Sequence, residues 1–241
     1  MKRILHVACS PRKQESESEQ IAQTILERLL KRDPTAVVIR RTVGNDEISH
    51  IDPSYATALG ATQPTIAEAL PEGSMARSED LIQELESSDI LVIGTPMHNF
   101  TVPSGLKAWI DHIVRVRRTF NSTKDGYVGT LRDRPVFVAV SSGGRYSGGR
   151  VRQPDFLTPY LKAVLNTIGL HDLTFFSIQG TSSAPDIVAD ARAKTNQEIQ
   201  NYLTGWNPPV TGQHLPTNGA SQDVNCVLAP APPVPTSIMD Q

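Results

Sequence analysis

The sequence has little of several features that define common classes of protein. Its 241 residues include only two cysteines, Cys9 and Cys226, which is too few for a disulfide framework or a cysteine metal site. The six histidines are scattered without the spacing of metal ligands. Acidic and basic residues almost cancel, leaving a formal net charge of −2 and no basic field to attract nucleic acid. We therefore expect no metal centre and no nucleic-acid partner.

Long apolar runs are absent as well. No stretch approaches the roughly 20 apolar residues that a membrane-spanning helix needs. The N-terminal MKRILHVACSPRKQ contains an apolar run that is too short, and too soon followed by charge, for a signal peptide. The sequence therefore predicts a cytoplasmic protein with no membrane partner.

What the chain does contain is a regular alternation of short apolar runs and helical patterns. Strands are predicted at Ile4–Cys9, Ala36–Ile39, Ile90–Gly94, Val136–Val140 and Leu173–Ile178. Helices are predicted around residues 21–30, 78–85, 103–116, 156–168 and 185–203. This order predicts an α/β fold in which helices cover both faces of a parallel sheet. Five strands suggest the doubly wound, flavodoxin-like strand order 2-1-3-4-5, although periodicity alone does not establish it.

Two parts of the chain break this alternation. Residues 44–74 carry three prolines and are interpreted as an insertion with one short helix at most. From Gly205 onward, seven prolines interrupt any regular element. We therefore predict a domain at residues 1–204 and an irregular, proline-rich tail at residues 205–241.

Polar or glycine-rich segments follow the first, third and fourth strands, where the ligand of an open α/β sheet is expected. In the first, CSPRKQESESEQ, the hydroxyls of Ser10, Ser16 and Ser18 precede a helix whose free N–H groups suit a phosphate. The absence of glycine between Cys9 and Ser18 excludes a dinucleotide fingerprint or P-loop there. The alternative interpretation is an ordinary helix N-cap.

The other two segments provide a surface for a flat ligand. Pro96 stiffens the start of a loop in which Met97, His98, Asn99 and Phe100 combine apolar and hydrogen-bonding groups. After the fourth strand, Gly143 and Gly144 allow close approach of a ring to the backbone. The alternatives are a plain loop covering the core and a flexible loop without a ligand.

Together and in this order, these segments resemble the FMN-dependent NADH azoreductases and quinone reductases of the flavodoxin-like superfamily. The most specific match is TPMHNFTVPSGLKAWIDHIVRVRRTF at residues 95–120. The serines of the first loop, the SGG after the fourth strand and LTPYLKAVLNTIGL also match. The resemblance covers approximately residues 1–204 and does not extend into the tail.

The resemblance implies an FMN site made from all three segments. Its phosphate part would comprise Ser10, Ser16, Glu17 and Ser18, with Glu17 contributing main chain only. The residues along the isoalloxazine ring would be Met97, His98, Asn99 and Phe100, and those at its pyrimidine side would be Ser141, Ser142, Gly143 and Gly144. Two positions depart from the family pattern, because the family usually has tyrosine at His98 and often arginine at Ser142.

The activity implied is hydride transfer from NADH or NADPH to FMN, followed by reduction of quinones or azo compounds in two-electron, ping-pong steps. No side chain is expected to act as a catalytic acid or base. The family resemblance also implies a homodimer with active sites at the interface. The helix that begins near Pro103 has apolar residues over a wide arc, which suggests a face that a second copy would cover. Phe120 or Phe156 of one chain would then lie over the flavin of the other.

Three alternatives remain at this stage. One is an NADPH-dependent FMN reductase or nitroreductase of a sister family. The second is a flavodoxin-type electron carrier without a substrate pocket, and the third is a flavin-dependent regulator or scaffold that acts through the proline-rich tail. Flavodoxins are smaller and strongly acidic, so the length and near-neutral charge of this chain favour an enzyme.

Overall fold

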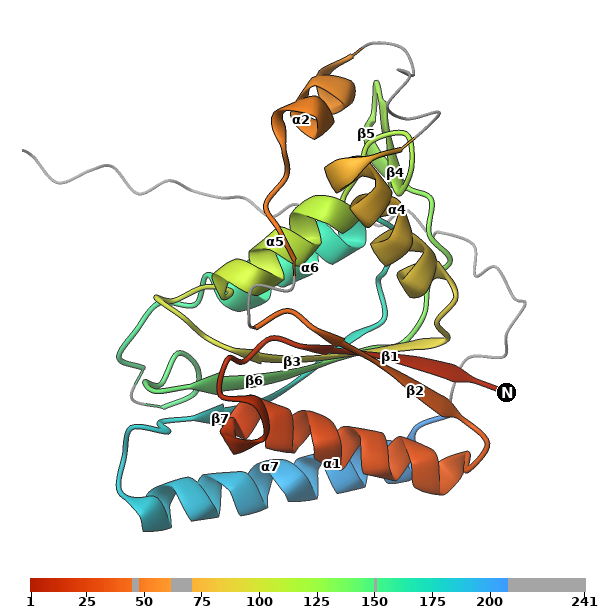
Figure 1. Ribbon diagram of the computed structural model, residues 1–241. Helices are drawn as coiled ribbons and strands as arrows, with labels where there is room; N and C mark the ends of the chain where they lie inside the picture. The colour runs from red at the N-terminus through yellow and green to blue at the C-terminus, as the bar shows by residue number, and fades with distance from the viewer. Residues whose placement is uncertain (45–47, 62–70, 150, 208–241) are drawn as a thin grey trace, which may run out of the picture. The chain divides into compact units, whose positions relative to one another are not determined.

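A parallel sheet of five strands forms the centre of the protein (Figure 1). The computed structural model describes residues 1–44, 48–61, 71–149 and 151–207. The strands are β1 (Arg3–Ala8), β2 (Val37–Thr42), β3 (Ile90–Pro96), β6 (Val136–Ser142) and β7 (Leu173–Gln179). Their order across the sheet is β2-β1-β3-β6-β7, and every neighbouring pair is parallel. The predicted flavodoxin-like fold and strand order are confirmed.

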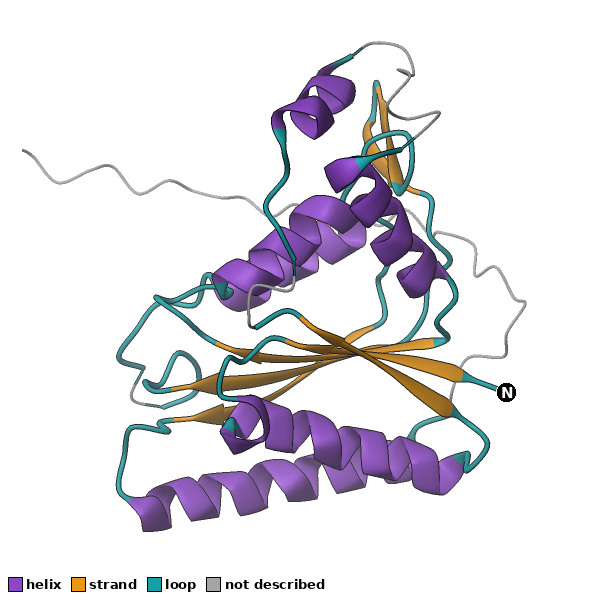
Figure 2. Ribbon diagram, in the orientation of Figure 1, coloured by secondary structure: helices purple, strands orange, loops and turns teal. Residues whose placement is uncertain are grey.

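Helices cover both faces of this sheet (Figure 2). One face carries α1 (Glu17–Arg32) and α7 (Pro185–Gly205), which pack against each other. The opposite face carries α4 (Gly73–Glu86), α5 (Ser104–Ile113) and α6 (Leu157–Thr167). Parallel strands need such crossover helices, so the central strands β1, β3 and β6 are buried on both faces.

The strand residues divide alternately between two cores. Leu5 and Val7 of β1 belong to the core under α4, α5 and α6, whereas Ile4 belongs to the core under α1 and α7. This alternation follows from the two-residue period of a strand. Each core is built from residues distant in sequence, which fixes the relative positions of the strand ends.

The insertion covers α5 within a single chain. Its helix α2 (Pro53–Gly60) places the hydroxyl of Tyr55 3.1 Å from the main-chain oxygen of Asp111. Helix α4 packs along α5, and Trp109 and Ile113 are fully buried. The expectation that the apolar arc of this helix stays uncovered within one chain is therefore wrong for its central residues.

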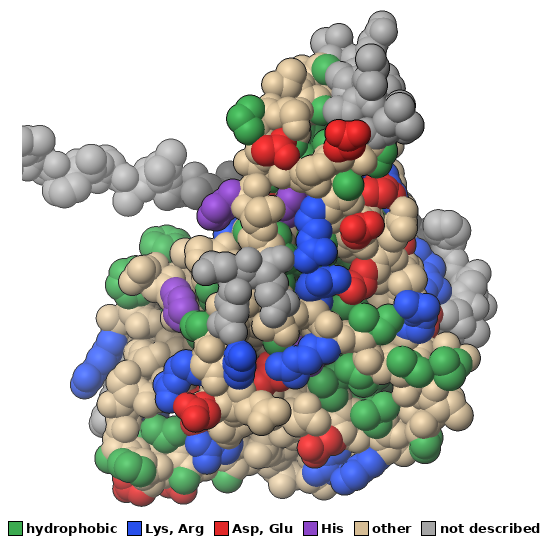
Figure 3. All heavy atoms as spheres, viewed as in Figure 1, with side chains coloured by type: hydrophobic (Ala, Val, Ile, Leu, Met, Phe, Trp, Pro, Cys, Tyr) green, Lys and Arg blue, Asp and Glu red, His purple; other side chains and the backbone are tan. Residues whose placement is uncertain are grey.

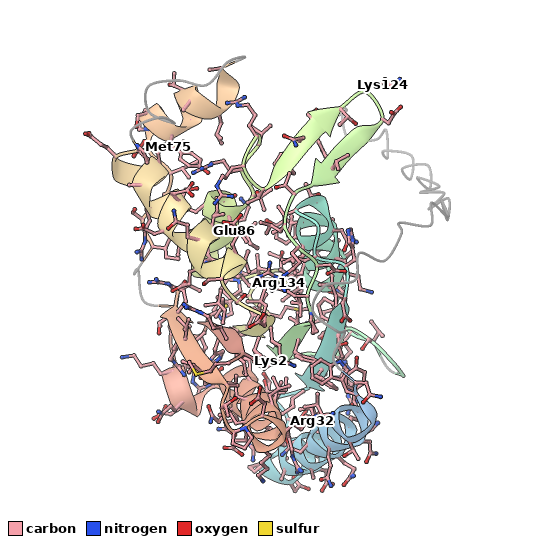
Figure 4. All side chains as sticks on the ribbon, turned by 90° about the vertical axis from the view of Figure 1, so that its right-hand side faces the viewer. Lys2, Arg32, Met75, Glu86, Lys124 and Arg134 are labelled. Carbon is pink, nitrogen blue, oxygen red and sulfur yellow. The ribbon has the colours of Figure 1, made fainter. Side chains whose placement is uncertain are left out.

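A second, two-stranded sheet was not expected from the sequence. It is the antiparallel hairpin of β4 (Phe120–Thr123) and β5 (Gly126–Gly129). The segment before it is fixed by charge, since Arg115 and Arg118 both pair with Glu79 of α4, at 2.6 and 2.9 Å. Arg118 also pairs with Glu86, which Figure 4 labels on α4.

The last described residues pack on the core between the sheet and helices α1 and α7, which is called the lower core below. Trp206 lies edge-on to Phe137, and the Arg32 guanidinium lies 5.8 Å from its ring centroid. Arg32 also donates a hydrogen bond to the carbonyl of Leu203. The predicted boundary at residue 204 stays a prediction, and Cys226 with nearly all of the predicted tail lies outside the described residues.

Candidate functional site

The carboxyl ends of the strands form one continuous edge, opposite the end where the chain begins in Figure 1. Ala8 of β1 is in register with Gly94 of β3, and Pro96 of β3 is in register with Ser141 of β6. A Cβ added at Gly94 would lie 3.3 Å from the carbonyl oxygen of Ser18 and 3.1 Å from Ala22, so a side chain there would push α1 away by a few tenths of an ångström. The start of α1 is therefore packed directly on this edge.

The first candidate segment ends in a helix start that no side chain caps. Ser16 is the N-cap residue of α1, yet its hydroxyl makes no capping hydrogen bond. The hydroxyl instead lies 2.9 Å from that of Ser18. Since the first N–H groups of a helix have no intrahelical acceptor, α1 retains hydrogen-bond donors and positive potential at this point. Ser10 organises the preceding turn, because its hydroxyl accepts the N–H of Arg12 at 3.2 Å.

The carboxylates of this helix start are held away from that point by arginines. Glu17 pairs with Arg192 of α7, at 3.0 and 2.5 Å. Buried Glu19 lies 2.7 Å from Arg40 and 3.5 Å from His6 Nε2. Burial acts to raise the pKa of Glu19, but His6 and Arg40 outweigh it and hold the pKa below its usual value. Both carboxylates are thus neutralised by nearby positive groups, which removes their electrostatic repulsion of an anion at the helix start.

Cys9 lies beneath this loop and is chemically inert. Its side chain is fully buried directly after the last residue of β1. Burial, followed by the charge of Glu19, raises the pKa of the thiol far above its usual range. Because the thiolate is the nucleophilic form, this environment disfavours a nucleophilic role for Cys9.

The second segment forms a tight two-residue turn. The N–H groups of His98 and Thr101 donate to each other's carbonyl oxygens, at 2.9 and 3.0 Å. Between them, Asn99 and Phe100 have φ angles of 47° and 72°. A positive φ is costly for a bulky residue such as phenylalanine, and such strain is concentrated at functional sites. The turn projects the exposed side chains of His98, Asn99 and Phe100 from the edge of the sheet.

The third segment is bonded directly to the second. The N–H of Met97 donates to the carbonyl oxygen of Ser141 at 2.7 Å. Ser141 and Ser142 are buried, whereas Gly143 is exposed. The hydroxyl of Ser142 donates to the carbonyl oxygen of Gly144 at 2.9 Å. These contacts join residues 97–101, the Met97 turn, to residues 143–149, the glycine loop. The two segments form one surface beside the start of α1.

Two glutamines in this region were missed by the sequence analysis. Gln153 contacts both Met97 and Ser142 through its side-chain amide. Gln179, at the end of β7, accepts the N–H groups of Tyr146 and Ser147 at 2.9 and 3.0 Å. Neither glutamine belongs to a periodic pattern or a motif. Only its place at or after the carboxyl end of a strand could have drawn attention to it.

The predicted residues are therefore brought to one edge, in two groups. Residues 97–100 and 141–144 are hydrogen-bonded to each other, and the serines of the first loop flank them on the neighbouring strand. Within the described part of the chain, no three histidine, cysteine or acidic side chains gather as a metal site. No helix there is both long and apolar enough to cross a bilayer.

The opposite edge of the sheet lacks this chemistry. A hollow of about 140 Å³ lies there between Lys2, Arg32 and Trp206. Figure 4 labels Lys2 and Arg32 on this side of the molecule. Its apolar lining belongs to the lower core, and Arg32 already serves the end of α7. The face seen in Figure 3 carries acidic and basic side chains interspersed, without a field of one sign.

Comparison with known proteins decides the family. Residues 2–203 match the family described as having a flavodoxin-like fold. The chain is 49% identical over 180 residues to FMN-dependent NADH:quinone oxidoreductase 4 of Pseudomonas fluorescens, covering 75% of this chain and 85% of that protein. It is 46% identical over 189 residues to oxidoreductase 5 of Burkholderia lata, covering 78% and 89%. The chain belongs to the flavodoxin-like family that includes these FMN-dependent NADH:quinone oxidoreductases.

Solved structures agree with this family at the level of the fold. An FMN-dependent NADH-azoreductase from Bacillus anthracis, determined in complex with FMN, is 26% identical, with a TM-score of 0.67 and coverage of 83% of this chain and 99% of that one. A second azoreductase from the same species is 20% identical, with a TM-score of 0.69 and coverage of 84% and 100%. The family resemblance stated from the sequence is confirmed.

Proposed function

We propose that this protein is an FMN-dependent oxidoreductase that takes a hydride from NADH or NADPH and passes electrons to quinones and azo compounds. The observation that carries the proposal is the uncapped start of α1 on the same edge as the strained Asn99–Phe100 turn. A phosphate site and a ring-sized surface on adjacent strands suit a flavin mononucleotide. The relatives in this family are named as FMN-dependent NADH:quinone oxidoreductases, which supports the same activity.

The residues present fit the phosphate of such a cofactor. We propose that Ser10, Ser16 and Ser18, with the N–H of Glu17, surround it. The Glu17 side chain is turned to Arg192, so only its main chain is offered to a ligand. Ser18 is fully buried and bonds to Ser16, so the Ser16 hydroxyl would be the more direct contact.

The ring would lie along the other two segments. We propose that Met97, His98, Asn99 and Phe100 contact its length, and that Ser141, Ser142, Gly143 and Gly144 meet its pyrimidine side. When bound, the flavin supplies the hydride chemistry, while this chain binds and orients both substrates. Main-chain N–H groups of the glycine loop would stabilise negative charge on the pyrimidine side. Protons are available from water at this exposed edge, so no general acid is assigned.

Successive use of one surface accounts for the expected substrates. The nicotinamide and the acceptor are both planar, and each would stack in turn over the exposed side chains of His98 and Phe100. A quinone takes two electrons in one round. Full cleavage of an azo bond takes four, hence two rounds. Neither the relatives nor the geometry favours an electron carrier over this enzyme.

We further propose that the protein is a homodimer, on different evidence from that expected. Phe100 and Phe156 are 44% and 58% exposed and adjacent, since the N–H of Phe156 donates to the carbonyl oxygen of Phe100 at 3.0 Å. Large exposed aromatics beside a site are typical of an interface. Phe156→Asp should convert a dimer to monomers in sedimentation equilibrium. Ile113 is buried in the core, so a charge there would unfold the chain. A wild-type chain that is monomeric and fully active would refute the dimer.

The cytoplasmic location expected from the sequence stays a prediction.

The decisive experiment for the activity is a flavin and turnover assay. We expect the purified protein to be yellow and to release FMN on denaturation, as identified by mass spectrometry. Anaerobic NADH or NADPH should bleach the flavin, and a quinone or an azo dye should restore its colour. Release of FAD would refute the cofactor assignment, and a flavin that neither nucleotide reduces would leave the protein an electron carrier.

A further inference from the structure

Gln153 occupies an unusual place between two site segments. It lies in the loop between β6 and α6, where its N–H bonds to the carbonyl oxygen of Arg145 at 3.2 Å. Its side-chain nitrogen lies 2.8 Å from the hydroxyl of Ser142 and 3.0 Å from the sulfur of Met97. An added Cβ on residue 144 would lie 2.2 Å from Gln153 Oε1, so the Gln153 side chain would have to leave this position. Gly144 therefore makes room for this carboxamide.

The hydrogen-bond chain around Gln153 fixes which way its amide faces. The Ser142 hydroxyl lies 2.9 Å from the carbonyl oxygen of Gly144 and 3.8 Å from the Met97 sulfur, so its proton is directed to the nearer oxygen, which is an acceptor only. The hydroxyl oxygen and the Met97 sulfur are then left as acceptors, which the amide nitrogen serves. Gln153 Oε1 has no hydrogen-bond donor in the described part of the chain. This oxygen is therefore a hydrogen-bond acceptor beside Gly144 that the described residues leave available.

We propose that Gln153 is a cofactor-binding residue whose side-chain carbonyl oxygen accepts the hydrogen bond of the flavin N3–H group. This inference rests on the proposed function. The oxidised isoalloxazine ring carries one N–H donor, on its pyrimidine side, between two carbonyl groups. A pyrimidine side bound at Ser141–Gly144 needs one acceptor among several donors, and Gln153 Oε1 supplies it. Such an acceptor also discriminates against rings substituted at N3.

The test compares FMN with N3-methyl-FMN, which lacks this donor. Both are titrated into the flavin-free protein and followed by fluorescence. For each variant, the measured ratio is the dissociation constant of N3-methyl-FMN divided by that of FMN. Gln153→Met preserves the volume of the side chain without an amide acceptor. A net neutral hydrogen bond corresponds to about a threefold to tenfold effect on affinity. We expect Gln153→Met to weaken FMN by that factor and to leave N3-methyl-FMN nearly unchanged, so that the ratio falls.

A matched control is available on the neighbouring strand. Gln179 also orders the glycine loop, through the N–H groups of Tyr146 and Ser147, but it does not contact Met97 or Ser142. Gln179→Met should keep the wild-type ratio. Gln153→Ala serves as a second variant and should lower the ratio as Gln153→Met does. Wild-type ratios in both Gln153 variants would overturn the inference. A wild-type protein that binds no FMN would instead refute the proposed function.

Discussion

At the scale of single residues, the candidate site is built from groups whose ordinary partners are missing. A serine at an N-cap normally bonds to its own helix, but Ser16 does not. A phenylalanine normally avoids a positive φ, but Phe100 has one. The Asn99–Phe100 turn costs stability that the two hydrogen bonds between His98 and Thr101 help to offset. Departures of this kind at one edge of a sheet indicate a surface shaped for a ligand.

The phosphate contact gives the first prediction. Replacing Ser16 and Ser18 together by alanine should weaken FMN binding by at least about tenfold, because a hydrogen bond to a charged group contributes about 1.5–3 kcal/mol. Ser16→Ala alone should account for most of the loss, since Ser18 is buried behind it. Fluorescence titration of the flavin measures both, with exposed Ser122→Ala of the hairpin as control. Unchanged affinity in the double variant would remove this loop from the site.

At the scale of elements, charge rather than apolar packing fixes α4 against the segment that follows α5. Burial acts to raise the pKa of Glu79, but hydrogen bonds from Arg118 and Arg115 lower it to about 2, from an ordinary value of 4.5. Arg115 is itself buried, so pairing with Glu79 offsets the cost of removing its charge from water. The network orients the chain just before the β4–β5 hairpin.

This network predicts how stability depends on pH. Because the folded pKa of Glu79 is depressed, its contribution is fully present above pH 4.5 and is lost as the pH falls toward 2. Glu79→Gln should lower the free energy of unfolding by about 1–3 kcal/mol at pH 7 and by progressively less below pH 4.5. Urea unfolding at pH 7 and pH 3 measures both gaps. Exposed Glu27→Gln should have little effect at either pH, and a Glu79→Gln gap independent of pH would contradict the assignment.

Elements with a strong period were predictable from the sequence, and weaker ones were not. The central strands β1, β3 and β6 are buried almost throughout, so their apolar runs stand out, whereas β2 at the edge ends in Arg40, Arg41 and Thr42. Strands β2 and β3 extend three and two residues beyond the predicted ends. The β4–β5 hairpin escaped because its strands have four residues each, around the polar turn at Lys124 and Asp125. Helix α4 begins at Gly73, five residues before its predicted start, because its first turn lacks an apolar period.

The site was predictable in its position but not in its connections. Loops after β1, β3 and β6 could be expected to converge, because parallel strands end at one edge. The bond from Met97 to Ser141 and the reach of Gln153 across the loop depend on tertiary contacts. The same holds for α5, whose apolar arc indicated a buried face without showing that α2 and α4 of the same chain cover it.

At the scale of the whole molecule, the described chain ends on the side away from the site. Trp206 packs on Phe137 and Arg32, so the residues just after 204 contribute to the lower core. The sheet thus separates the residues that would bind flavin from those that close the C-terminal end of the domain. Changes at one edge should affect the other only through overall stability.

Truncation tests that separation. A chain ending at Asn207 should keep the FMN affinity and the thermal midpoint of the full-length protein. A chain ending at Leu203 loses Trp206. Its free energy of unfolding should be about 1–3 kcal/mol lower than that of the full-length protein, because a half-buried aromatic is removed. Its folded form should still bind FMN with the same affinity. Loss of FMN binding by the shorter chain while it remains folded would show that the tail contributes to the site.

The strand order also determines when this protein can acquire its cofactor during synthesis. Strand β1 is made first but lies between β2 and β3, and the glycine loop after β6 follows much later in the chain. A nascent chain that has reached only β2 therefore presents β1 with an unpaired, apolar edge. It carries the uncapped start of α1 without the Met97 turn or Gln153 beside it. If flavin binds at the proposed site, it would bind only after β6 has joined the sheet, which is too late to guide the early steps of folding.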